Sequence, residues 1–317
     1  MTLRQQASRH LREFDSFVQL RRLQHEGFSN AYRRWCMWRR ILELPPINTD
    51  PITASAAVEV HLVCCQKDYL CALWALKTFY ATAGGSYPLV IHLNGTMSSL
   101  AMSRLRGHLP QARLLPQDGV EQQVNEWLTA NRCPRLQAVR ARNGFMLKLV
   151  DVNVLAEGRR LLLLDSDVLF FDHPGALVDA MRQRLDGILF QRDAGSTYNI
   201  TSDTARDDLG ILLQPSVNTG IMLFDKGAID LARCEQLLGH PDVARQSGWI
   251  EQTLYALVAS ERNAVRYLPS SYLVSLEPRV QVGTLVARHY AGPSRPYLTE
   301  EGMPFALSRL QTGMTVA

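Results

Sequence analysis

The stretch that most constrains the fold of this chain is RRLLLLDSDVLFFDHP, at residues 159–174. Four consecutive leucines lead directly into Asp165-Ser166-Asp167, and a second apolar run follows. A short, uninterrupted apolar run of this kind predicts a strand that is buried on both faces of a sheet. Carboxylates at the end of such a strand lie at the sheet edge where open α/β sheets bind ligands.

Two interpretations of this D-x-D motif are open. Asp165 and Asp167 are two residues apart, so a local bend at the strand end can turn both carboxylates toward one cation. Carboxylate oxygens suit hard divalent ions such as Mg²⁺ or Mn²⁺. The alternative is an ordinary strand end followed by a turn, because D-x-D is short and common.

The remaining segments alternate between strand-like and helix-like patterns. Further strands are predicted at 58–65, 87–93, 112–115, 187–190, 216–224, 264–268 and 285–289. Helices are predicted at 68–82, 98–107, 120–130, 144–156, 228–238 and 250–260. This alternation predicts an α/β fold with a mostly parallel sheet flanked by helices. The polar stretch 191–215 shows no clear period and is predicted to be a functional loop or lid.

The positive charge of the chain is concentrated at its N-terminus. The net charge is +4, and residues 1–40 carry nine arginines and three acidic residues, which leaves −2 for the rest. Apolar residues at helical spacing lie between these arginines, which predicts a helical arm that ends at Pro45-Pro46. It could lie on an anionic membrane surface, bind a partner, or pack on the domain with its arginines in solvent, which we favour. We expect no nucleic-acid partner, because no recognition motif accompanies the charge.

Cysteine usage and hydropathy bear on location. The six cysteines form no C-x-x-C pair and are interpreted as buried thiols in a reducing compartment. The sequence contains neither a cleavable signal nor a run of about 18 apolar residues. We therefore expect a cytoplasmic protein, peripheral to the inner face of a membrane only through residues 1–44. The predicted organisation is a basic helical arm at 1–50, a catalytic domain at 51–300 and a tail at 301–317.

Other polar residues fall at the ends of later elements. They are the pairs Asn218 and Gly220, Glu251 and Gln252, and His289 and Arg295. Each pair alone has a structural interpretation, such as first-turn charge at a helix start or a structural histidine. Together with the D-x-D carboxylates they indicate a metal–diphosphate site, with an imidazole on the cation and a guanidinium for phosphate oxygens. The dinucleotide glycine fingerprint and the P-loop are both absent, which argues against a simple dehydrogenase or NTPase.

In this order the motifs resemble those of GT-A glycosyltransferases, above all the family-eight type that includes glycogenin. There an apolar strand runs into D-x-D, as LLLLDSDVLFF does here, and a strand opening N-x-G follows, as in VNTGIMLF. IEQTL stands where the family has Asp-Gln, and HYAGPSRPY matches its closing His-x-x-Gly-x-x-Lys-Pro-Trp segment. The match covers residues 58–297. It departs from the family at Glu251, at Arg295 in place of Lys, and at Tyr297 in place of Trp.

The resemblance implies a metal-dependent enzyme that moves a hexose from a nucleotide-diphospho-sugar, with UDP expected, to an acceptor hydroxyl with retention. It implies that Asp165, Asp167 and His289 bind Mn²⁺ or Mg²⁺. The residues implied at the donor are Cys64, Asp68, Lys148, Asp165, Ser166, Gly220, Gly292 and Arg295. Those implied near the transferred sugar are Gln252, Glu251 and Asn218.

Several alternatives stay open at this stage. Lys148 could be a solvated helix lysine, and Asp68 could merely cap the helix that follows it. The enzyme could invert configuration with Glu251 as general base, or the chain could be a non-catalytic nucleotide-sugar-binding relative. A sugar nucleotidyltransferase is disfavoured, because VCCQKDYL lacks the glycine-rich loop that such enzymes need. The acceptor, whether carbohydrate, lipid-linked or protein, is not specified.

Overall fold

The computed structural model describes residues 28–50 and 57–312. The arginine-rich stretch 1–27, for which helices are predicted, lies outside the described residues, as do 51–56 and 313–317.

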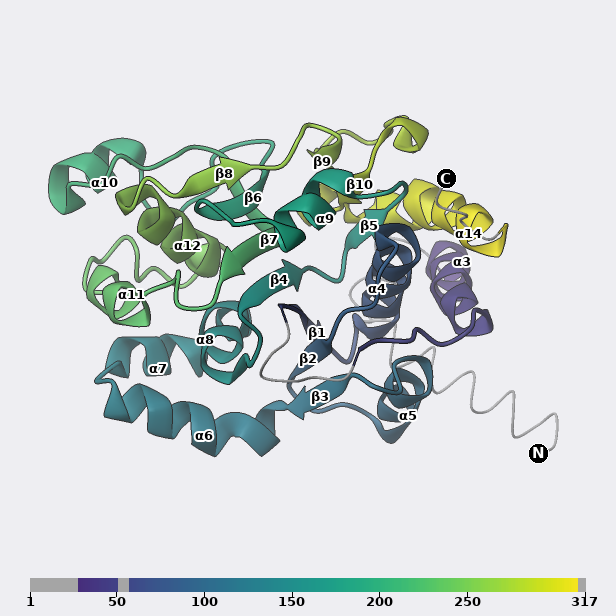
Figure 1. Cartoon of the computed structure of the whole chain (residues 1–317), viewed down its shortest axis with the longest axis horizontal. Coiled ribbons are helices and arrows are strands. Elements are labelled where there is room, and N and C mark those ends of the chain that lie inside the picture. The colour runs from purple at the N-terminus through teal and green to yellow at the C-terminus, as the bar shows by residue number, and fades with distance from the viewer. Residues whose placement is uncertain (1–27, 51–56, 313–317) are drawn as a thin grey trace.

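Within the described residues, seven strands form the central sheet in the order β3-β2-β1-β4-β7-β6-β8 (Figure 1). They are β1 Val58–Cys65, β2 Leu89–Asn94, β3 Arg113–Pro116, β4 Arg160–Leu164, β6 Ile188–Arg192, β7 Val217–Asp225 and β8 Val265–Tyr267. Strand β7 runs antiparallel to both of its neighbours, whereas the other adjacent strands are parallel. The prediction of a mixed, mostly parallel sheet is confirmed.

A second, smaller sheet lies beside the end of β4. Its order is β5-β10-β9, with β5 Val168–Phe170, β9 Tyr272–Val274 and β10 Ala287–His289. Only Asp165-Ser166-Asp167 separates β4 from β5, so the chain leaves one sheet and enters the other at the D-x-D motif. The stretch 159–174 therefore forms two strands rather than one, and the bend between them is closed by the Val168 N–H, which donates to the Asp165 carbonyl at 3.3 Å.

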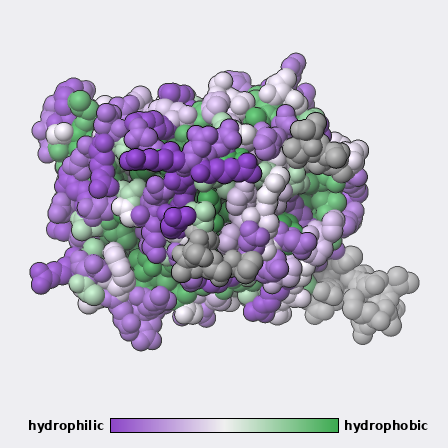
Figure 2. All heavy atoms as spheres, in the orientation of Figure 1, coloured by the Kyte–Doolittle hydropathy of each residue, from purple (hydrophilic) through white to green (hydrophobic). Residues whose placement is uncertain are grey.

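Helices cover both faces of the central sheet (Figure 1). They include α4 Tyr69–Ala83, α5 Ser99–His108, α6 Gln117–Ala130, α7 Pro134–Arg140, α8 Met146–Leu155, α9 Gly175–Arg182, α10 Ser202–Leu209, α11 Leu231–Leu237 and α12 Ile250–Glu261. One apolar core joins the sheet to α4, α5, α9 and the second sheet, and the other joins it to α6, α7, α8, α11 and α12. On the face drawn in Figure 2, hydrophilic side chains cover much of the surface and hydrophobic ones show between them. The sequence predicted neither α7 nor β9, and it placed α10 in a stretch expected to be a loop.

The described part of the N-terminal arm is packed on the domain. It consists of α3 Phe28–Arg39 and the 3₁₀ turn η1 Arg40–Glu43. Trp38 is buried, and the Trp74 indole donates to its carbonyl at 3.0 Å. The Lys77 ammonium donates to three backbone carbonyls within 41–45, at 2.8 to 3.1 Å. These contacts agree with the packed-arm interpretation for residues 28–45.

The C-terminal residues also pack on this side of the molecule. After η3 Gly292–Ser294 come α13 Arg295–Tyr297, the π-helical turn η4 Leu298–Gly302 and α14 Met303–Gln311. Residues 301–311, expected to be part of a tail, thus lie largely in α14, with Met303 and Ala306 buried in the core next to α4. None of the described helices combines the length and the apolar character needed to span a bilayer.

All six cysteines are free thiols. Four are buried, but Cys36 and Cys65 are half-buried. The prediction that all six are buried is therefore wrong for these two. Cys36 lies on the surface helix α3, and Cys65 ends β1 at the edge of the sheet.

Candidate metal and catalytic site

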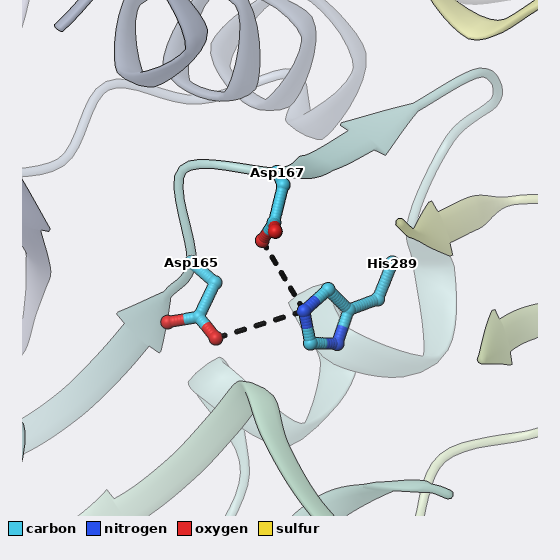
Figure 3. Close-up of side chains that lie close together, drawn as sticks. All are labelled: Asp165, Asp167 and His289. Carbon is cyan, nitrogen blue, oxygen red and sulfur yellow. Dashed lines mark ion pairs between the residues drawn. The ribbon is translucent and has the colours of Figure 1, made fainter. Parts of the chain in front are cut away.

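Three side chains that are far apart in the sequence meet where the chain passes between the two sheets (Figure 3). Asp165 follows β4, Asp167 precedes β5, and His289 ends β10. The Nε2 atom of His289 lies 3.2 Å from Oδ1 of Asp167 and 3.7 Å from Oδ2 of Asp165. One ligand atom from each residue lies within 4.8 Å of the other two. The D-x-D motif is thus part of a three-residue cluster.

A hydrogen bond on the side of the His289 ring away from the carboxylates fixes the orientation of the imidazole. Its Nδ1 lies 2.8 Å from Oδ1 of Asn218, and that same oxygen accepts from the Gly220 N–H at 2.9 Å. Because Oδ1 can only accept, Nδ1 carries the proton and Nε2 faces the two carboxylates. A Cβ atom on residue 220 would lie 2.3 Å from Nδ1, so only glycine leaves room for the ring. The N-x-G motif therefore sets the imidazole in place.

The charges of the cluster are strongly coupled. Burial by itself raises the pKa of Asp167, but Arg295 and His289 hold that pKa well below its ordinary value. Burial lowers the pKa of His289, yet the Asp167 and Asp165 carboxylates raise it above its ordinary value. Two carboxylates and a ring nitrogen whose other nitrogen is already bonded form a donor set that fits a divalent cation such as Mn²⁺ or Mg²⁺.

A guanidinium borders the cluster on the side of β1. Arg295 donates to Oδ1 of Asp68 at 2.6 Å, and it lies 3.3 Å from Oδ2 of Asp167. The Cys65 thiol donates to the other oxygen of Asp68 at 3.1 Å. The Asp68 side chain makes no capping bond to α4, so the cap interpretation does not hold. Gly292 has a φ of +52°, a conformation that favours glycine, in the turn that leads from His289 to Arg295.

A buried lysine joins the D-x-D motif to α12. The Lys148 ammonium lies 2.9 Å from Asp165 and 3.5 Å from Glu251, and it donates to the carbonyl and hydroxyl of Thr219, both at 3.1 Å. Lys148 is 5% exposed, so the solvated-lysine interpretation is wrong. Burial opposes its charge, but the carboxylates of Asp165 and Glu251 raise its pKa. Burial raises the pKa of Glu251 to about 7, although Lys148 lowers it.

The neighbouring Gln252 contacts a residue that the sequence reasoning missed. Its Nε2 donates to Asp193 at 3.3 Å and to the carbonyl and hydroxyl of Thr197 at 3.1 and 3.0 Å. Asp193 directly follows β6, so it stands at a strand end, as the D-x-D carboxylates do. The sequence did offer one signal for Asp193, a carboxylate directly after the apolar run GILFQR. However, its position along the chain did not connect it with the other motifs.

The structure does not bring every predicted site residue to the cluster. The Cys64 side chain is 1% exposed in the apolar core, because alternate side chains of β1 point to opposite faces. Its neighbour Cys65 is the cysteine that reaches Asp68. Ser166, at the tip of the bend, is half-buried.

Comparison with known proteins gives two different results. No profile of a known protein family and no curated protein matches the sequence. Solved structures do match. The glycosyltransferase GlyE of Streptococcus pneumoniae TIGR4 aligns with a TM-score of 0.50 and 12% identity, over 84% of this chain and 62% of GlyE.

Two further solved structures align at slightly lower scores. The bifunctional glycosyltransferase WbbM gives 0.49 and 13% identity, over 85% of this chain and 53% of WbbM. Mouse xyloside xylosyltransferase 1 gives 0.48 and 14%, over 73% and 96%. The chain thus spans about half of WbbM and less than two thirds of GlyE. At such identities the likeness to GlyE speaks to the fold alone, and the fold of this chain is the GT-A fold that its motifs predict.

Proposed function

We propose that this protein is a metal-dependent glycosyltransferase that moves a hexose from a nucleotide-diphospho-sugar to an acceptor hydroxyl. The observation that carries the proposal is the cluster of Asp165, Asp167 and His289, with the imidazole held by Asn218, at the crossing between the two sheets of a GT-A fold. The resemblance to family eight favours UDP as the nucleotide and retention of configuration.

The cation would be held by Asp165, Asp167 and His289. When bound, Mn²⁺ or Mg²⁺ supplies positive charge against the diphosphate that leaves as the glycosidic bond breaks. The rest of the chemistry belongs to the side chains of the chain itself. Asn218 keeps Nε2 of His289 turned toward the carboxylates, and Gly220 leaves room for the ring.

Arg295 is positioned to hold the diphosphate. It is paired with Asp68 and Asp167, and its side chain is 27% exposed. A guanidinium presents two parallel N–H groups, so Arg295 can keep one carboxylate partner and bind phosphate oxygens with the rest of its fork. Lys148 contacts Asp165 and Glu251 at the back of the site, and its positive charge there opposes the rise in the pKa of Glu251 that burial causes.

Gln252 is the best candidate for contact with the transferred sugar. Its amide nitrogen is held by Asp193 and Thr197, which leaves the carbonyl oxygen to face the reacting carbon. A carbonyl dipole in that position stabilises the positive charge of an oxocarbenium-like sugar. Asp193 orients this amide and is itself fixed by the Thr197 hydroxyl at 2.9 Å.

A second candidate is an inverting transferase in which Glu251 is the general base. It is favoured by one observation, the pKa of about 7, which suits a base that works near neutral pH. However, the Glu251 side chain is 3% exposed and contacts Lys148 and Thr219, which suits a positioning role better. The anomeric configuration of the product, read by proton NMR, distinguishes the two mechanisms.

The test is donor turnover. Purified protein is incubated with Mn²⁺ and, separately, UDP-glucose, UDP-galactose, UDP-N-acetylglucosamine and GDP-mannose, and nucleotide release is measured with and without EDTA. We expect slow release from one UDP-sugar that EDTA abolishes and Mn²⁺ restores. Binding of a nucleotide-sugar without release would indicate a non-catalytic relative. If the protein neither binds nor turns over any of these donors, the proposal is contradicted.

The place of the protein in the cell is a separate proposal. We propose a cytoplasmic enzyme in which residues 28–45 of the arm pack on the domain, with any membrane contact confined to residues 1–44. Co-sedimentation with vesicles that contain anionic lipid compares the full chain with a variant lacking residues 1–27. Equal and weak sedimentation agrees with a packing arm, whereas loss of strong sedimentation on deletion would show a membrane anchor.

A further inference from the structure

Two large aromatic side chains are exposed at the starts of the two helices that carry buried polar residues of the proposed catalytic site. Phe145 is 55% exposed and Trp249 is 53% exposed. Phe145 immediately precedes α8, the helix that carries Lys148, and Trp249 immediately precedes α12, which carries Glu251 and Gln252. Both helices that supply buried polar groups to the site thus begin at an exposed aromatic residue.

The two helices run in the same direction, which brings their first residues together. Near the start, Lys148 on α8 lies 3.5 Å from Glu251 on α12. One turn further along, the Asn153 amide of α8 lies 3.5 Å from the Tyr255 hydroxyl of α12. The sheet gives the same result. Strands β4 and β6 both run antiparallel to β7, and β8 runs parallel to β6, so β4, which follows α8, points the same way as β8, which follows α12. The two helices therefore begin at the same edge of the sheet.

The loops before the helices are joined as well. The Asn143 side-chain amide donates to the Ser247 carbonyl at 2.8 Å. The ring of Phe145 lies against Gly248, where an added Cβ would be 3.8 Å from Cε2. Phe145 lies against Gly248, the residue that precedes Trp249, so the two aromatic residues stand on adjoining loops, and we call them the aromatic pair.

Each member of the aromatic pair precedes a site residue of its own helix by nearly one turn. Phe145 precedes Lys148 by three residues, and Trp249 precedes Gln252 by three, so each aromatic residue shares a helix face with its site residue. Three residues rise about 4.5 Å along the axis, which is close to the length of a pyranose ring. A sugar lying on the aromatic pair would thus be the next ring along from a sugar held at Gln252.

We propose that Phe145 and Trp249 form the acceptor subsite and bind the apolar face of a pyranose, so that the acceptor is a carbohydrate. The inference rests on the proposed function and extends it to the second substrate. The C–H groups on one face of a pyranose are slightly positive and meet the negative face of an aromatic ring, while its hydroxyls need polar neighbours. The exposed Arg142 and Gln246, one on each of the two loops, supply such groups. A lipid chain would need a continuous apolar surface, which these polar neighbours interrupt.

The experiment measures transfer and donor hydrolysis separately in the full chain. With the donor found above, lactose, maltose, cellobiose and a serine-containing peptide are compared as acceptors. We expect one of the disaccharides to be used, and Trp249→Ala to lower transfer relative to hydrolysis about 10- to 100-fold, mainly through the acceptor KM. Trp249→Phe should retain most of the transfer, since it keeps a ring. Leu212→Ala is the matched surface control. It truncates a 72% exposed leucine in a segment that bonds to Ser260, at the opposite end of α12 from Trp249.

A direct binding measurement keeps the inference testable if turnover fails. Saturation-transfer NMR of the same disaccharides, with UDP and diamagnetic Mg²⁺ present, should show contact with the wild-type protein and much less with Phe145→Ala/Trp249→Ala. Circular dichroism confirms that the double variant is folded. If hydrolysis occurs but the peptide is the preferred acceptor, or if the double variant binds and uses disaccharides normally, the inference is overturned while the proposed function stands. If no donor is turned over, the proposed function fails, and the NMR result alone decides the carbohydrate subsite.

Discussion

Helix α8 carries two buried charged residues three positions apart, and their partners differ in kind. Asp151 accepts from Arg140 through two bonds, at 2.6 and 2.8 Å, and both side chains are 1% exposed. Arg140 also donates to Glu121 at 2.8 Å. This pair is geometrically complete, because a planar fork meets both carboxylate oxygens.

Lys148, on the same helix, contacts two carboxylates at longer distances than those between Arg140 and Asp151. It serves Asp165 at 2.9 Å and Glu251 at 3.5 Å. Within the described residues, Oε1 of Glu251 has no hydrogen-bond partner. The pKa of Glu251 is raised to about 7, and burial is the main cause. The group formed by Lys148 and Glu251 therefore has an unused hydrogen-bond acceptor, whereas in the pair of Arg140 and Asp151 both carboxylate oxygens are bonded.

The difference shows which buried charges hold the fold and which are available for chemistry. A saturated pair leaves no donor or acceptor for a ligand, and breaking it leaves a buried charge uncompensated. Incompletely bonded buried groups with perturbed pKa values gather at functional sites. We assign Arg140 and Asp151 to stability, and Lys148 and Glu251 to the site.

The largest effect is expected at the metal cluster. Asp167→Asn removes one carboxylate charge without changing shape, so we expect kcat/KM for the donor to fall by about 10³-fold or more. Nucleotide release in Mn²⁺ measures it. Asp186→Asn is the matched control, because that side chain is 95% exposed and pairs only at the surface with Arg266. Equal rates in the two variants would show that the cluster is misassigned.

The next effect separates stability from activity. Arg140→Met leaves the Asp151 carboxylate buried without its partner, which should cost about 3–5 kcal/mol of unfolding free energy. Urea unfolding gives the cost, and activity per folded molecule should stay near that of the wild type. A loss of specific activity in fully folded Arg140→Met protein would contradict the assignment of this pair to the fold.

Lys148→Met should show the opposite pattern. Removal of the ammonium leaves Asp165 and Glu251 without their shared cation and raises the pKa of Glu251 above its value of about 7. We expect kcat to fall about 10- to 100-fold and the pH–rate profile to move to higher pH. The control is Lys226→Met, which removes a partly exposed lysine bonded to the Ala156 carbonyl. An unchanged kcat and profile would remove Lys148 from the site.

The smallest effect concerns a third buried network at the start of β1. Burial alone raises the pKa of Glu59, but the His61 ring and the backbone N–H groups of Gly158 and Glu157 lower it to about 2. Because the folded pKa lies below the unfolded one, this contribution is present above about pH 4.5 and is lost as the pH falls toward 2.

After allowance for solvent screening we expect a loss of about 2 kcal/mol over that range. Unfolding free energies measured from pH 7 to pH 3 should fall more steeply for the wild type than for Glu59→Gln. His92 acts in the same direction, because burial lowers its pKa well below the ordinary value. Parallel curves for the two proteins would contradict the role of Glu59.

The sequence predicts the parts of the fold that have a clear local pattern of apolar residues. The buried strands β1 and β7 and the helices α4, α8 and α12 are long apolar runs, and each falls within a few residues of its predicted range. The sequence did not predict the short elements α7, α10 and β9. Segments of eight residues or fewer carry little periodic signal, so tertiary contacts decide their form.

The candidate site divides in the same way. Asp165, Asp167 and His289 could be named because ordered motifs mark them. The pairing of Lys148 with Glu251 could not, since it joins residues more than one hundred positions apart and depends on how two helices pack. Asp193 was missed for a related reason, because its partner Gln252 lies on another element. The absence of the Cys64 side chain from the site could not be predicted either, because it depends on which face of β1 packs against the core.

The most direct test of the account is a titration of the protein with Mn²⁺, followed by electron paramagnetic resonance of the free ion, with and without UDP. The account predicts one bound Mn²⁺ per chain, held more tightly when UDP is present, and loss of this binding in Asp167→Asn but not in Asp186→Asn. Wild-type protein that binds no Mn²⁺ even with UDP, or Asp167→Asn protein that binds it as the wild type does, would contradict the central claim.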